Sequence, residues 1–307
     1  MPRFVLRALC ALALLPGAAV ADPYDFRVYL LGNPVSSATA NANFRLFARQ
    51  FGAAMTSVNL APAETLGHSG FSFTLEMCTL LGFDKSEVGL PTESPGGRKT
   101  QVMLVPSVHI RKGLPWSFEL GARGGWIEKS RMGIATLELK WAINEGFRYL
   151  PDLAVRGAIS KLINSRDFDV TAGGLDLGIG KQFALGGMVT LTIYGGWNLV
   201  FVGASSGTVD FDPSRPLADA DTSASQYQNY WVFQDVYAKD NSHSRFYGGL
   251  RFIGGVAQLG FEASYSMIEK FTHTDEIATN PDGTARGVVQ FQGSNIIAIN
   301  GTIGLDF

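Results

Sequence analysis

The chain has 307 residues, a formal net charge of −2, and only 17% charged residues. This near balance gives no reason to expect nucleic acid as a partner, since nucleic-acid binding usually shows as a basic patch. With 46% hydrophobic residues, including 21 phenylalanines, the chain is long enough to bury a core, so the question is where its apolar faces point.

The first 21 residues are typical of a secretory signal peptide. Arg3 and Arg7 precede a short apolar run over 8–15, and the tripeptide ending at Ala21 has the small residues of a cleavage site. The run is too short to span a membrane. Cleavage near Ala21 would remove Cys10 and leave Cys78 as the single cysteine, so an internal disulfide is excluded.

Residues 22–68 form the second predicted unit, and they carry a helical pattern. Phe44, Phe47, Phe51 and Met55 recur at the spacing of one helical face. We therefore predict an amphipathic helix here, followed by a turn around Pro62.

The third unit, residues 69–307, alternates between apolar and polar residues. Between Trp116 and Trp126, for example, Phe118 and Leu120 share one face, while Glu119 and its neighbours of the same parity share the other. A period of two over about ten residues predicts strands. The ten segments are 70–80, 102–111, 115–127, 131–143, 151–163, 168–181, 187–202, 244–254, 256–270 and 294–307.

Strand length and connection length favour a transmembrane barrel over a soluble sandwich or a lipocalin-like barrel. Strands of about ten residues cross a bilayer, whereas soluble strands are usually shorter. The longest gaps, 81–101, 203–243 and 271–293, all fall on one side of the predicted sheet, as in outer-membrane barrels. The uncharged stretch 182–209 could be a membrane helix, but its glycines and alternating threonines favour strands.

We therefore predict an all-β fold, a transmembrane antiparallel up-and-down β-barrel of about ten strands with a short helical N-terminal segment. Twelve strands are the alternative, if the stretch "DFRVYLLG" and part of the long loop also pair.

The last strand resembles the C-terminal strand of the Gram-negative outer-membrane β-barrel superfamily. Alternate positions are Gly301, Ile303, Leu305 and the terminal Phe307. The resemblance implies an outer-membrane location, contact with outer-membrane lipid, and Phe307 as the assembly signal for the barrel-assembly machinery.

The N-terminal segment is loosely similar to the hatch of long-chain fatty-acid transporters. The Asn-Pro-Ala turn of that family is replaced here by residues 59–63, "NLAPA", and those barrels have more strands. Two roles stay open for this segment. It would be either a cap on the periplasmic mouth, or a plug or gate inside the lumen formed by Phe44, Phe47, Phe51 and Met55.

The polar face of the strands predicts a charged lumen. The predicted lumen-lining residues are Glu76, His109, Arg111, Glu119, Arg123, Glu138, Lys140, Arg156, Arg251 and Glu262. Carboxylates and basic groups occur on neighbouring strands, so they are expected either to pair and close the lumen or to line a narrow selective path.

Motifs for chemistry are weak, and we predict no enzyme, no cofactor and no metal. The stretch 203–207 matches G-x-S-x-G, but no helix follows it. Two histidines lie near an aspartate in the sequence, His243 near Asp240 and His273 near Asp275. A resemblance to ten-stranded outer-membrane proteases would imply a hydrolytic pair of this kind at the outer rim. No local motif of that family is present. Whether the acidic loop 203–243 binds calcium stays open.

The sequence favours a function in the passage or binding of a small solute, gated by the N-terminal segment. Hydrophobic solutes are included in this prediction. The alternative is a closed barrel that serves structurally or displays external loops for adhesion or recognition. An outer-rim hydrolase ranks third.

Overall fold

The computed structural model describes residues 26–34, 37, 39–56, 60–83, 90–91, 102–186, 189–210, 230–268, 271–274, 288–291 and 293–307. The expected signal peptide and cleavage site lie outside these residues, as do Asn59, Asp275 and much of the acidic loop.

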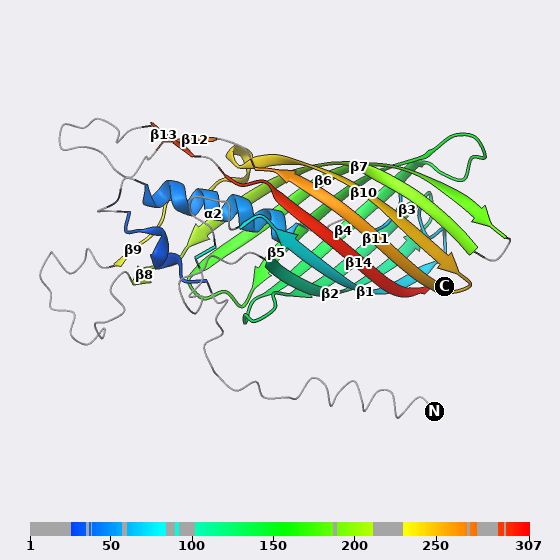
Figure 1. Ribbon diagram of the computed structural model, residues 1–307, viewed down its shortest axis with the longest axis horizontal. Coiled ribbons are helices and arrows are strands. Elements are labelled where there is room, and N and C mark those ends of the chain that lie inside the picture. The colour runs from blue at the N-terminus through cyan, green and yellow to red at the C-terminus, as the bar shows by residue number, and fades with distance from the viewer. Residues whose placement is uncertain are drawn as a thin grey trace, which may run out of the picture.

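Ten antiparallel strands close into a barrel, which confirms the predicted fold class (Figure 1). The order around the barrel is β1-β14-β11-β10-β7-β6-β5-β4-β3-β2. The strands are β1 (Phe71–Leu81), β2 (Val102–Leu114), β3 (Phe118–Trp126), β4 (Gly133–Asn144), β5 (Asp152–Ile163), β6 (Phe168–Leu185), β7 (Val189–Ser206), β10 (Ser242–Gly254), β11 (Ala257–Met267) and β14 (Ile296–Asp306). The first and last strands pair over ten positions, from Ser72↔Asp306 to Leu81↔Ile297.

The alternative of twelve barrel strands is wrong. Within the stretch "DFRVYLLG", Val28–Leu31 forms a 3-10 helix, η1. The remaining short strands form two separate two-stranded sheets outside the barrel. These are β8 (Val209–Asp210) with β9 (Tyr230–Trp231), and β12 (Phe271–Thr274) with β13 (Val288–Phe291).

The apolar face of the strands points outward. On β4, Leu137, Leu139 and Trp141 are exposed, while Glu138 and Lys140 between them are buried inside the barrel. A water-soluble protein would reverse this arrangement, because exposed apolar side chains in such a continuous belt need a hydrocarbon environment. Closure also leaves no sheet edge with unpaired backbone groups in that environment.

The stretch 182–209, considered above as a membrane helix, lies in β6, β7 and β8 where it is described. Among the described residues, no helix has the length and apolar character needed to cross a membrane.

The barrel has two unlike ends. The short-turn end carries the connections 115–117, 145–151, 186–188 and 255–256 and the terminal Phe307. The long-loop end carries the connections 82–101, 127–132, 164–167, 207–241 and 268–295. In outer-membrane barrels the short turns face the periplasm, which makes the long-loop end the external one.

The N-terminal helix, α2 (Ala40–Met55), lies at the long-loop end, near β8, β9, β12 and β13 (Figure 1). This differs from the predicted cap at the periplasmic mouth. The reason is that the inner face of β6 and β7 is apolar towards this end, with Val170, Ala172, Val200 and Val202 buried, and only the apolar stripe of α2 can cover it.

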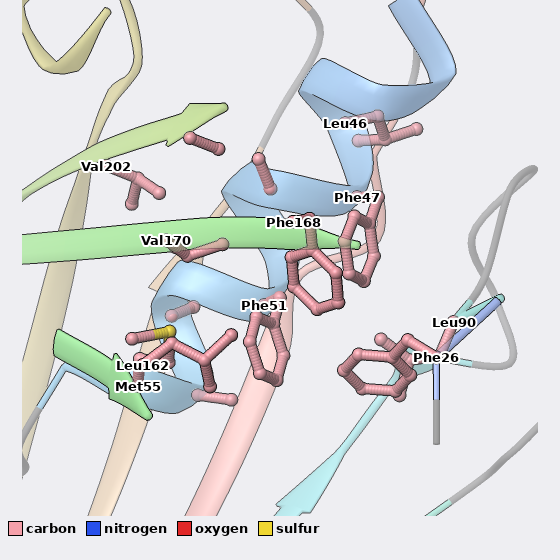
Figure 2. Close-up of a cluster of buried hydrophobic side chains, with 14 of the residues drawn as sticks. Phe26, Leu46, Phe47, Phe51, Met55, Leu90, Leu162, Phe168, Val170 and Val202 are labelled. Atoms are coloured by element: carbon pink, nitrogen blue, oxygen red, sulfur yellow. The ribbon is translucent and has the colours of Figure 1, made fainter. Parts of the chain in front are cut away.

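Aromatic side chains form the centre of this contact. The rings of Phe47 and Phe51 stack on each other with centroids 5.7 Å apart, and Phe26 meets Phe51 edge-on at 4.9 Å. Figure 2 shows these three rings grouped with Phe168 of β6. The helix is therefore packed as part of the protein's hydrophobic core, at the long-loop end of the barrel.

Candidate functional site

The candidate site is the lumen of the barrel. It is apolar around α2 and charged between α2 and the short-turn end. The charged part is organised around His109 of β2. Its Nδ1 lies 2.8 Å from Oε1 of Glu76 on β1, and its Nε2 lies 2.8 Å from Oε1 of Glu138 on β4. One imidazole thus joins two carboxylates from strands that are not neighbours.

Strand β3 lies between β2 and β4 and leaves room for the contact of His109 with Glu138. The reason is that Gly121 of β3 points inward opposite Glu138. A Cβ atom at Gly121 would lie 2.5 Å from Cγ of Glu138. An alanine there would push the carboxylate away from the imidazole.

Arginines complete the network on both sides. Nε of Arg123 lies 2.7 Å from Oε2 of Glu76, and Nη1 of Arg156 donates to Oε2 of Glu138 at 2.7 Å. Asp176 then lies 3.5 Å from Nη2 of Arg156 and accepts a 2.7 Å hydrogen bond from the Tyr247 hydroxyl. The network runs around the inner wall from β1 to β6 and reaches β10, so its charges are compensated within the protein.

Residues 60–66 occupy the charged part of the lumen, and strand side chains bind their backbone. Oε2 of Glu262 accepts a hydrogen bond from the Leu60 N–H at 2.8 Å. Nζ of Lys140 donates to the carbonyl oxygens of Pro62 and Glu64 at 3.2 and 2.9 Å. The charged side chains of the strands contact residues 60–66 as well as each other. They therefore hold this segment in place.

The segment ends near the short turns. Oε2 of Glu119 accepts from the Leu66 N–H at 3.0 Å, and Glu145 accepts from the Thr65 N–H at 2.8 Å. The Glu64 carboxylate pairs with Arg251.

Two hollows border this site. An internal cavity of about 30 Å³, lined in part by Met55, Cys78 and Arg123, has room for about one water molecule. A groove of about 800 Å³ lies where lipid-facing side chains such as Leu75 and Val108 meet Gly124. Both hollows are lined by Glu76, Ser107 and Gly125, so only small residues and one carboxylate separate them.

All ten residues predicted to line the lumen point inward, with exposed fractions between 0% and 8%. The four plug residues, Phe44, Phe47, Phe51 and Met55, are exposed by 2% or less. Phe307 lies elsewhere, at the short-turn end. It is 65% exposed and exchanges two backbone hydrogen bonds with Phe71.

The groups that the sequence did not predict include Asp176, Arg245 and Tyr247 of the lumen wall and the anchor Glu64. Asp176 could have been found from the outward Leu175 and Leu177 on either side of it. Arg245 and Tyr247 have the same parity as the predicted Arg251. No local pattern pointed to Glu64, because its role depends on where the segment runs.

Among the described residues, to which Asp275 does not belong, the remaining motifs form no catalytic arrangement. His243 faces inward and is only 4% exposed, and the backbone oxygen of Asp240 accepts a hydrogen bond from Arg45. Ser205, the serine of the G-x-S-x-G match, lies in β7 opposite Asp169 of β6. Among the described residues, no three or more His, Cys, Asp or Glu side chains gather as a metal site.

No family model and no curated protein matches the chain. Solved structures of outer-membrane barrels are similar. The outer membrane protease OmpT from Escherichia coli is 10% identical, with a TM-score of 0.36 over 79% of this chain and 97% of that one. The attachment invasion locus protein Ail of Yersinia pestis is 9% identical, with a TM-score of 0.28 over 78% and 99%. A Pseudomonas aeruginosa FadL homologue is 8% identical, with a TM-score of 0.22 over 84% and 97%.

These likenesses concern the fold alone. The closed ten-stranded sheet and its apolar outer face identify the chain as an outer-membrane-type β-barrel in a lipid environment.

Proposed function

We propose that this protein is a closed outer-membrane barrel that acts through its long-loop end, in recognition or adhesion, and not through an axial pore. The observation that carries the proposal is the occupied lumen. The helix α2 occupies the long-loop end, and residues 60–66 occupy the charged part of the lumen between α2 and the short turns.

The energetics of α2 support a closed resting state. Thirteen of its 16 residues are buried, and Phe44, Phe47 and Phe51 are fully enclosed. Exposing a large apolar side chain to water costs roughly 1.5–3 kcal/mol, so the three rings alone correspond to roughly 5–9 kcal/mol. Spontaneous release of the helix would therefore be rare.

Planar lipid bilayers give the direct test. We expect the purified, folded protein to carry no stepwise current. A variant without residues 22–66 should carry stepwise current, because it removes both α2 and residues 60–66 from the lumen, and it demonstrates that the assay detects an open barrel. Stepwise current from the unmodified protein would refute the closed barrel.

A second function, binding or passage of a small hydrophobic solute, is favoured by the groove of about 800 Å³ on the lipid-facing side. Its wall towards the internal cavity contains Ser107 and Gly125, which have little or no side chain. A solute would enter from the membrane rather than along the barrel axis.

A groove-filling variant tests this route. Gly124 points outward with no atom within 4 Å of an added Cβ, so Gly124→Trp fills the groove without a clash at Cβ. Gly157 of β5 does not line the groove and has similar space, which makes Gly157→Trp the control. We expect Gly124→Trp alone to reduce uptake of a hydrophobic fluorescent fatty acid by cells that produce the protein. Equal uptake by both variants would exclude the groove as a route.

A further inference from the structure

We infer that the chain crosses the membrane an eleventh time, inside its own barrel, so that residues 26–34, at the start of the described chain, lie on the external side while Phe307 lies on the periplasmic side. An even number of strands alone would leave both ends of the chain on one side. The inference is independent of whether the lumen conducts.

The start of the described chain is fixed at the long-loop end by contacts with the connection between β7 and β10. Oδ1 of Asn41 accepts a hydrogen bond from the Gln234 N–H at 3.0 Å, and the ring of Phe44 stacks on Phe233 at 4.8 Å. Phe26 packs on Phe47 at 5.3 Å, so the residues before α2 stay at the same end.

Two arginines of β10 mark the path of the N-terminal segment through the lumen. Arg245, near the long-loop end of β10, donates to the carbonyl oxygens of Ala53 and Thr56 at 2.6 and 3.2 Å. Arg251, six residues further towards the short turns, pairs with Glu64. Six residues of strand correspond to ~20 Å, and the eight residues from Thr56 to Glu64 can span at most ~29 Å. The eight residues are long enough to cover this distance, so the two contacts place Thr56 and Glu64 at successive levels of the lumen.

The segment leaves the lumen at the short-turn end. The Gly113 N–H donates to the carbonyl oxygen of Gly70 at 2.9 Å, and Nζ of Lys112 donates to that of Ser69 at 2.6 Å, next to the turn between β2 and β3. Strand β1 then begins at Phe71 and returns towards the long-loop end. Contacts at both ends and along the way thus describe one complete crossing.

Single-cysteine labelling on intact cells tests the inference in the full chain. In a Cys10→Ala, Cys78→Ala background, three exposed positions receive one cysteine each: Leu30 in η1, Tyr237 in the β7–β10 connection, and Tyr149 in the β4–β5 turn. Their exposed fractions are 50%, 61% and 86%, so the substitutions should not disturb folding, which the gel mobility of unheated samples verifies.

We expect a membrane-impermeant maleimide to label Leu30→Cys and Tyr237→Cys on intact cells. Tyr149→Cys should be labelled only after the outer membrane is permeabilised. The inference is overturned if Leu30→Cys and Tyr149→Cys react from the same side. That result would leave the conductance test of the closed barrel unaffected, so the two proposals can fail separately.

Discussion

Gly52 of α2 and Val202 of β7 lie so close together that a Cβ atom on Gly52 would sit 2.6 Å from Cγ1 of Val202. The helix approaches the barrel wall this closely only because position 52 has no side chain. Valine is short and stiff at χ1, so it has little freedom to move aside.

Substitution of Gly52 should therefore destabilise the protein despite a gain in helix propensity. Overpacking costs about 1–3 kcal/mol, while replacing glycine by alanine within a helix returns about 1 kcal/mol. We expect Gly52→Val to lower the free energy of unfolding more than Gly52→Ala does, as measured by urea titration in detergent micelles. Adding Val202→Ala should restore part of the loss, and strictly additive effects of the two changes would contradict the close contact.

The buried charges should be far more sensitive than the exposed ones. Glu138→Gln removes the carboxylate that lies 2.7 Å from Nη1 of Arg156 inside the barrel, and removing one member of a buried ion pair typically costs ~3–5 kcal/mol. The pair Lys161–Asp169 is about half exposed, at 52% and 50%, so Lys161→Met should cost only ~0–1 kcal/mol. Unfolding midpoints of the two variants provide the comparison, and equal losses would refute the structural role of the network.

The direction of the apolar face can be tested on a single strand. Leu177 lies within β6 and Leu185 at its short-turn end, and both point outward with exposed fractions of 51% and 47%. A lysine facing lipid costs ~2–4 kcal/mol at the bilayer midplane and ~0–1 kcal/mol near the interface. We expect Leu177→Lys to lower stability in phospholipid vesicles clearly more than Leu185→Lys. Indistinguishable losses would argue against burial of this face in lipid.

The local alternation of side chains made much of this architecture predictable. Neighbouring positions of a strand face opposite sides of a sheet, so residues such as Leu137 and Glu138 could be assigned to lipid and lumen from their order alone. The ten strands, the barrel class and the inward direction of Glu76, His109 and Arg156 follow from that period.

The strands and their faces could be predicted from the order of residues, because both depend on a period of two residues. The position of α2 at the long-loop end, the link from Glu76 through His109 to Glu138, and the pair of Glu64 with Arg251 became apparent only in the folded barrel. These relationships depend on closure of the sheet and on the path of residues 60–66 through it. They bring together groups that are up to 202 positions apart in the chain, and no local pattern records them.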